Sequence, residues 1–89
     1  MDITYDPTKD ETNKAKHGLS LADAVHLDWD ELLVKPDTRK DYGERREIGY
    51  GLIDERLYCV VFVQRGQSCH VISLRKANSR EVKAYESQT

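Results

Sequence analysis

The apolar positions of this chain follow two different periods, which divide it into a helical first half and a strand-rich second half. Residues 46–53 and 69–75 alternate between apolar and polar or small side chains, whereas residues 57–64 are almost entirely apolar. Short polar segments at 54–56 and 65–68 separate these runs and are typical of turns. The pattern predicts three consecutive antiparallel strands, with the middle strand covered on both faces.

The first half opens with a predicted short strand at residues 3–5 and a polar helix. Asp6-Pro7 is typical of an N-cap followed by the first helical residue. This helix is expected to run to about His17 and to end at Gly18, which suits a left-handed C-terminal position. Ala15 is the only apolar residue from Thr8 to His17, so tertiary contacts or a function must hold the helix in place.

A second helix is predicted after Ser20, which is a good N-cap, because apolar residues follow at positions 21, 24 and 25. It is expected to end near residues 27–29. Residues 32–34 fit either a short strand or a packed loop, and residues 36–41 are typical of an exposed connection.

Asn78 and Glu81 form a capping-box pattern that predicts a last helix running to about Tyr85. The order of elements predicts an α+β fold, with two N-terminal helices and a C-terminal helix packed on a mainly antiparallel sheet. The length of 89 residues allows one domain, which we expect to span residues 1–89.

The two hairpin turns decide which side chains share a face of this sheet. We expect the first turn to be centred on Glu55 and the second between Gly66 and Gln67. One face then carries Arg46, Ile48, Tyr50, Tyr58, Val60, Phe62, Val71, Ser73 and Arg75. The other face carries Gly49 and Gly51 and suits close helix packing.

The net charge of −2 argues mildly against a nucleic-acid partner, but the charge is unevenly distributed. The segment up to Glu44 has 6 Lys and Arg against 11 Asp and Glu, whereas the segment from Arg45 has 8 against 5. A local basic surface matters more for phosphate binding than the total charge does.

No apolar run approaches the roughly 20 residues that cross a membrane, and the first residues lack the pattern of a secretory signal. We therefore expect a cytoplasmic protein with no membrane partner. Cys59 and Cys69 fit neither a zinc site nor a redox motif, and the three histidines lack metal-ligand spacing. Buried free thiols are expected, and neither a metal nor another cofactor.

The mixed face has the groups that RNA cleavage requires. The 2′-hydroxyl attacks the adjacent phosphorus, so one group must accept its proton and cations must face the phosphate oxygens. The leaving 5′-oxygen must be protonated. Arginine supplies charge with fork geometry, and tyrosine stacks on a base or donates a proton. From the residues alone, the chain fits a nuclease, a nucleic-acid binder or a domain whose basic face binds a protein.

Three motifs follow one another in order and cover nearly the whole chain. The opening motif comprises Asp6-Pro7, Lys9, Asn13, Lys16-His17-Gly18 and Ser20. The central motif comprises Asp37, Asp41-Tyr42-Gly43-Glu44 and Arg46. The closing motif comprises Leu57 to Val63, Val71 to Ala77 and the helix from Glu81 to Tyr85. Together these motifs resemble the BrnT family. Departures from the family at Tyr5, Leu21, His26-Leu27 and Leu74 fall mostly on packing positions.

The resemblance implies a RelE-like fold and a growth-inhibiting ribonuclease toxin of a bacterial type II toxin–antitoxin pair. It also implies metal-free cleavage by a cluster of Arg, Lys and Tyr. The implied partners are RNA as substrate and a BrnA-like antitoxin with a DNA-binding domain. Toxin and antitoxin together would bind operator DNA and repress their own operon.

Carried to this sequence, the resemblance gives the catalytic candidates Arg75, Lys76, Arg46, His17, Glu81 and Tyr85. The substrate-binding candidates are Tyr50, Tyr58, Lys16 and Arg80. Arg75 and Arg46 are expected to bind the scissile phosphate, and Lys76 to stabilise charge or act as the acid. His17 or Glu81 is expected to accept the proton. The competing hypotheses are a non-enzymatic module that binds a partner or nucleic acid, such as a co-repressor, and a structural domain that depends on its partner.

Overall fold

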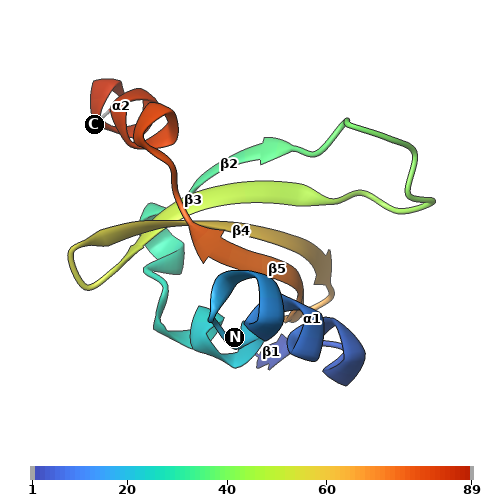
Figure 1. The fold of residues 1–89 in the computed structure, drawn as a ribbon. Coiled ribbons are helices and arrows are strands. Elements are labelled where there is room, and N and C mark those ends of the chain that lie inside the picture. Colours follow the sequence, from blue (N-terminus) through green and yellow to red (C-terminus); the bar gives the residue numbers. More distant parts are fainter. Residues whose placement is uncertain (1, 89) are drawn as a thin grey trace.

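The computed structural model describes residues 2–88 as a five-stranded sheet with helices on both faces (Figure 1). The elements are β1 (Asp2–Thr4), α1 (Pro7–His17), the 3-10 helices η1 (Leu21–His26) and η2 (Trp29–Glu31), β2 (Leu33–Pro36), β3 (Glu47–Ile53), β4 (Arg56–Arg65), β5 (Ser68–Lys76) and α2 (Ser79–Ser87). The strand order is β1-β5-β4-β3-β2, in which β1 runs parallel to β5 and all other neighbours are antiparallel. The predicted α+β fold with a mainly antiparallel sheet is confirmed, and residues 33–36 form a strand.

The two faces of the sheet are covered to different extents. The face beneath α1 and η1, here called the covered face, carries the main core of Leu21, Ala24, Leu27, Val60, Phe62, Cys69, Val71 and Leu74. The other face, here called the open face, carries a smaller cluster of Ile48, Cys59 and Val61, with Tyr50 and Ile72 packed against it. The helix α2 lies over one end of the open face, on the opposite side of the sheet from α1 (Figure 1).

Hydrogen bonds hold the polar helix α1 against the sheet. The side-chain amide of Asn13 donates to the carbonyls of Leu74 (2.8 Å) and Leu19 (2.9 Å), and its oxygen accepts from the Leu74 N–H (3.1 Å). One carboxylate oxygen of Asp10 accepts from the Leu21 N–H (2.7 Å) and the Ser20 hydroxyl (3.0 Å). Both side chains are buried. The lack of an apolar stripe in this helix is thus explained by buried polar contacts.

The second predicted helix is a 3-10 helix. Ser20 is its N-cap, as predicted, and forms a capping box with Asp23. Leu21, Ala24 and Leu27 are buried at intervals of three residues, which places them on one side of a helix with three residues per turn. The sequence therefore predicted a helix here, while the structure shows the tighter form.

Gly49 and Gly51 lie on the covered face, where they make room for Leu32. A Cβ atom added at Gly49 would lie 2.6 Å from Leu32 Cδ2, and one added at Gly51 would lie 2.5 Å from Leu32 Cδ1. The glycines were expected to allow a close approach, and the segment that approaches is the connection between η2 and β2.

The predicted pairing of the first hairpin was wrong by one residue. Ile53 pairs with Arg56, so the turn is the dipeptide Asp54-Glu55, and Asp54 has a positive φ of 55°. Tyr50 therefore lies opposite Cys59, and Tyr58 lies opposite Gly51. Because opposite residues share a face, Tyr58, Val60 and Phe62 point to the covered face and not, as expected, to the face of Tyr50.

The second hairpin has the predicted turn, since Arg65 pairs with Ser68. The register then shifts, because Phe62 pairs with Val71 while Val61 pairs with Ser73. Ile72 is thus the extra residue of a β-bulge. Beyond the bulge, Arg75 pairs with Cys59 on the open face and Lys76 pairs with Tyr58 on the covered face.

Cys59 and Cys69 are buried free thiols, as expected. Within residues 2–88 no helix is long and apolar enough to cross a membrane.

Candidate active site

An ion pair between Arg75 and Glu81 joins the end of β5 to the first turn of α2. Arg75 Nη1 donates to Glu81 Oε1 at 2.8 Å, and Nη2 donates to Oε2 at 2.9 Å. Nη1 also donates to the carbonyl of Lys76 at 3.2 Å. The side chains are 35% and 17% exposed, so the pair is partly shielded from water but still accessible. This arrangement fixes the plane of the Arg75 guanidinium.

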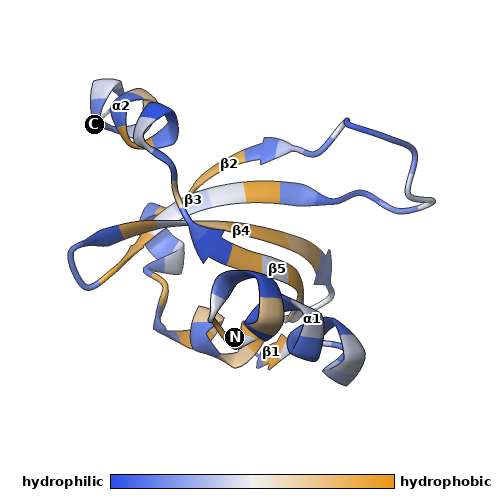
Figure 2. Cartoon of the chain, in the orientation of Figure 1, coloured by the Kyte–Doolittle hydropathy of each residue, from blue (hydrophilic) through white to orange (hydrophobic). Residues whose placement is uncertain are grey.

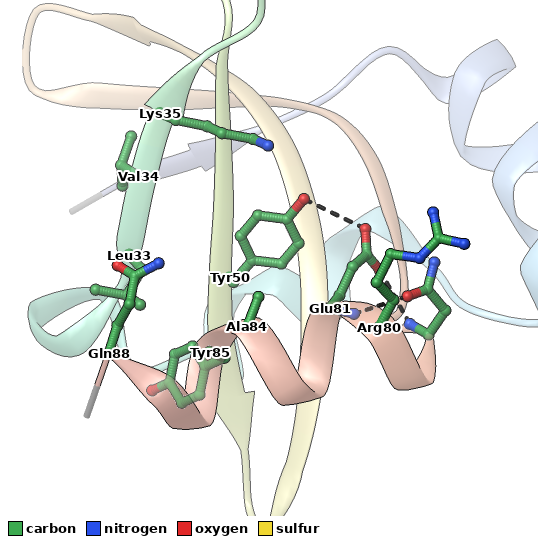
Figure 3. A pocket seen from close by; sticks show the side chains of 10 residues that line it. Leu33, Val34, Lys35, Tyr50, Arg80, Glu81, Ala84, Tyr85 and Gln88 are labelled. Carbon is green, nitrogen blue, oxygen red and sulfur yellow. Dashed lines mark hydrogen bonds between the residues drawn. The ribbon is translucent and has the colours of Figure 1, made fainter.

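Glu81 is held in turn by the helix start and by Tyr50. Its Oε1 accepts from the backbone N–H of Asn78 (2.9 Å), while the Asn78 side chain accepts from the backbone N–H of Glu81 (2.8 Å). This is the predicted capping box. The Tyr50 hydroxyl donates to Oε2 at 3.2 Å (Figure 3). Each carboxylate oxygen of Glu81 therefore accepts two hydrogen bonds.

The pKa values in this cluster follow from these contacts. The hydrogen bonds from Arg75 outweigh desolvation and, with the Asn78 N–H, lower the pKa of Glu81 to about 2. Burial, together with the charges of Cys59 and Glu81, raises the pKa of Tyr50 to about 12. Glu81 is consequently a carboxylate and Tyr50 a neutral donor at neutral pH.

A groove of about 410 Å³ adjoins this cluster between α2 and the strands β2 and β3 (Figure 3). It is lined by Leu33, Val34, Lys35, Tyr50, Asn78, Arg80, Glu81, Ala84, Tyr85 and Gln88. The Lys35 ammonium lies 5.8 Å from the centre of the Tyr50 ring. The groove thus offers two tyrosine rings and two cations beside the Arg75–Glu81 pair, which suits a nucleotide.

A second group of charged residues occupies the loop from residue 37 to residue 46, which is mostly hydrophilic (Figure 2). Arg39 Nε and Nη2 each donate to the buried carboxylate of Asp37 at 2.8 Å. The guanidinium of Arg46 stacks on the Tyr42 ring at 3.9 Å from its centre. Asp37, Arg39 and Tyr42 were not among the predicted site residues, although Asp37 and Tyr42 belong to the central motif.

The structure brings together five of the ten predicted site residues. Arg75, Glu81 and Tyr50 are in direct contact, and Arg80 and Tyr85 line the same groove. Arg46 lies on the same face of the sheet as Tyr50. The N–H of Asp37 donates to the Arg46 carbonyl (2.8 Å), which extends the β2–β3 pairing by one residue pair.

Four predicted residues lie elsewhere. Lys76 and Tyr58 face the covered side, where they line a shallow depression at the β3–β4 turn. Lys16 and His17 are exposed at the end of α1. Across residues 2–88, no hydrogen bond or ion pair joins any of these four side chains to the Arg75–Glu81 pair.

The same described residues contain no group of three His, Cys, Asp or Glu side chains placed to hold a metal ion. The expected lack of a metal remains a prediction, which a chelator tests directly.

Comparison with known proteins places the chain in a family. The family model described as "Ribonuclease toxin, BrnT, of type II toxin-antitoxin system" matches residues 5–81. Among solved structures, the ribonuclease toxin BrnT of Brucella abortus is 31% identical, with a TM-score of 0.69 over 89% of this chain and 99% of the Brucella chain. A search of curated proteins finds no match. Since the matched region contains β2 to β5 and the capping box of α2, the chain belongs to the BrnT family of ribonuclease toxins of type II toxin–antitoxin systems.

Proposed function

We propose that this chain is an endoribonuclease that cleaves RNA without a metal ion on the open face, with Arg75 as the ligand of the scissile phosphate. The observation that supports this assignment best is the bonding of Arg75. A guanidinium has five N–H donors. Three of them bind Glu81 and the Lys76 carbonyl, which leaves Nε–H and one hydrogen of Nη2 for a phosphate.

Glu81 is proposed to position Arg75 and not to accept the proton of the 2′-hydroxyl. Its pKa of about 2, lowered mainly by Arg75, makes it a weak base, and both of its oxygens are occupied. His17 then remains as the proposed proton acceptor from the family motif. It lies at the exposed end of α1, on the covered side of the sheet, so this proposal requires the RNA to bend around the β5 edge to bring the 2′-hydroxyl within hydrogen-bond reach of the imidazole. Lys76 leaves β5 toward the other face, so we assign it to charge stabilisation at the strand end and not to the same phosphate.

The groove beside this pair is proposed to bind a nucleotide next to the cleaved bond. Tyr50 and Tyr85 supply rings, and Arg80 supplies a cation at the groove. Base stacking on tyrosine is worth about 1–3 kcal/mol per base in single-strand binding. RNA is the substrate class that the family description supports.

We further propose that a BrnA-like antitoxin neutralises the toxin and that the complex represses its own operon in the cytoplasm. Membership in a type II family supports a protein antitoxin. The identity of that antitoxin and its binding to operator DNA are inferred from the resemblance.

A non-enzymatic co-repressor is the second candidate function. It is favoured by one observation: Glu81 already neutralises Arg75, so the strongest cation of the site does not stand alone. In that case the open face would bind the antitoxin and perform no chemistry.

The test is incubation of the purified chain with a defined RNA in EDTA, with and without the antitoxin. Arg75→Ala is expected to lower the cleavage rate by about 100-fold, the loss typical of removing one donor to transition-state charge. Arg65→Ala is the matched control, because Arg65 also pairs with a glutamate, Glu44, but at 3.3 Å and at the other end of β4. Equal cleavage by wild type and a folded Arg75→Ala protein would refute the assignment, and intact RNA in every lane would favour the co-repressor.

A further inference from the structure

We propose that the residues of the 37–46 loop on the open face, Asp37, Arg39, Tyr42 and Arg46, form a second RNA-binding subsite, in which Arg39, held by Asp37, binds a backbone phosphate away from the cleaved bond. This inference rests on the proposed ribonuclease function and extends its substrate site. The ligand is single-stranded RNA that crosses the open face from α2 toward this loop.

The loop lies on the same face as the candidate active site. Leu33 pairs with Tyr50 and Lys35 pairs with Ile48. The N–H of Asp37 bonds the carbonyl of Arg46, which continues this pairing by one step. Asp37 and Arg46 thus share the face of Tyr50, and a strand rise of about 3.4 Å per residue puts Arg46 about 14 Å from Tyr50 along the strand direction.

Arg39 is oriented so that half of its guanidinium is free for a ligand. Its Nε and Nη2 bind the Asp37 carboxylate side-on at 2.8 Å each, and its backbone N–H also donates to Asp37 at 3.2 Å. The Asp37 side chain is 0% exposed, whereas that of Arg39 is 66% exposed. Tyr42 interacts more weakly with both side chains. The other Nη hydrogens of this largely exposed guanidinium form the fork that binds phosphate oxygens.

The neighbouring stack supplies a second element of a nucleic-acid site. The guanidinium of Arg46 lies on the ring of Tyr42, which places a cation and an aromatic ring in the same loop as Arg39. Proteins that bind single strands combine these two groups. Arg46 Nε is buried and has no hydrogen-bond partner among residues 2–88, so its N–H is left to a ligand or a water molecule.

The electrostatics connect the two ends of the face. Burial raises the pKa of the Cys59 thiol. The positive charge of Arg75 opposes this shift and the negative charge of Glu81 adds to it, while the hydrogen bond with Tyr50 and, more weakly, the charge of Arg39 oppose it. The charges of both arginines therefore reach Cys59 in the middle of the open face, although each arginine is bound to its own carboxylate. An RNA strand that crosses the open face would meet Arg75 at one end and Arg39 at the other.

The test measures binding of a fluorescent ten-nucleotide 2′-O-methyl RNA, which lacks the attacking hydroxyl, by anisotropy between 50 and 200 mM salt. Arg39→Gln is expected to weaken binding about 3- to 10-fold and to lower the salt slope by about 0.7, the value for one phosphate contact to a single strand. Arg45→Gln is the matched control, because Arg45 is 73% exposed and pairs with Glu47 at 2.7 Å on the other side of the strand.

The outcomes separate this inference from the proposed function. Equal effects of the two substitutions, or no binding by wild type, would overturn the subsite whether or not RNA is cleaved. If the wild type does not cleave RNA but Arg39→Gln selectively weakens RNA binding, only the proposed ribonuclease function is overturned. If Arg39→Gln weakens antitoxin binding but leaves RNA binding unchanged, the loop is a protein contact and the inference fails. Should Arg39→Gln not fold, Asp37→Asn/Arg39→Gln removes the buried charge and is compared with Arg45→Gln/Glu47→Gln.

Discussion

The side chain of Asn13 replaces a neighbouring strand for Leu74, 61 residues away in the sequence. Its amide donates to the Leu74 carbonyl at 2.8 Å and its oxygen accepts from the Leu74 N–H at 3.1 Å. The strand β1 pairs only with residues 68–70 of β5, so this part of the edge has no strand partner on that side. Asn13 therefore closes the sheet edge directly before Arg75.

Asn13→Ala is expected to lower the free energy of unfolding by about 2–3 kcal/mol, because two buried backbone groups lose their partner. Urea unfolding at neutral pH measures this loss. Thr12→Ala is the control, since Thr12 is exposed and bonds only within α1. Its effect is expected to stay within about 0.5 kcal/mol. Similar values for the two variants would mean that Asn13 does not hold the edge.

Gly51→Ala is expected to destabilise the fold by about 1–3 kcal/mol through overpacking. The new Cβ would lie 2.5 Å from Leu32 Cδ1, and Leu32 is half-buried and packed against the main core. A double-mutant cycle with Leu32→Ala measures the clash, because the cost of Gly51→Ala is expected to shrink once Leu32 is shortened. Additive costs in the cycle would place the strain elsewhere.

Much of this fold could be predicted from local signals. Asp6, Ser20 and Asn78 cap helices as predicted, because a cap depends on a few adjacent residues. The register of the first hairpin could not be predicted, since Asp54 and Glu55 fit a two-residue turn as well as a turn centred on Glu55. The observed pairing differs from the predicted one by one residue, and Tyr58 therefore lies on the covered face.

The candidate site was predictable where its residues are close in sequence. Arg75 and Glu81 are six residues apart in the sequence, and the capping box of Asn78 and Glu81 predicted that Glu81 lies in the first turn of the last helix. The bulge at Ile72 decides that Arg75, and not Lys76, reaches the open face, and it depends on packing between distant strands. The Asp37–Arg39 pair was missed because an alternating charge run in a loop looks like a solvated surface.

Glu81→Gln is expected to lower stability by about 1.5–3 kcal/mol at pH 7, where hydrogen bonds to its charge are present. Arg75 lowers the folded-state pKa of Glu81 to about 2, below its ordinary 4.5. Because folding lowers the pKa of Glu81, its ionised carboxylate stabilises the fold above about pH 4.5, and this stabilisation is lost as the pH falls toward 2. The difference between wild type and variant should therefore shrink over that range. Glu55→Gln, at the exposed turn, should show no such trend.

The pH dependence of cleavage distinguishes the two proposed proton acceptors. With a pKa held near 2 by Arg75, Glu81 stays ionised from pH 4 to 8 and cannot produce a fall in rate within that range. A loss of kcat/KM on the acidic side of that range would therefore come from another group, and His17 is the proposed one. The acidic limb should then vanish in His17→Ala and persist in Glu81→Gln. His26→Ala is the control, because His26 is an equally exposed imidazole on η1. Loss of the limb in Glu81→Gln but not in His17→Ala would instead assign the proton to the carboxylate, and would require Glu81 to release Arg75 when RNA binds.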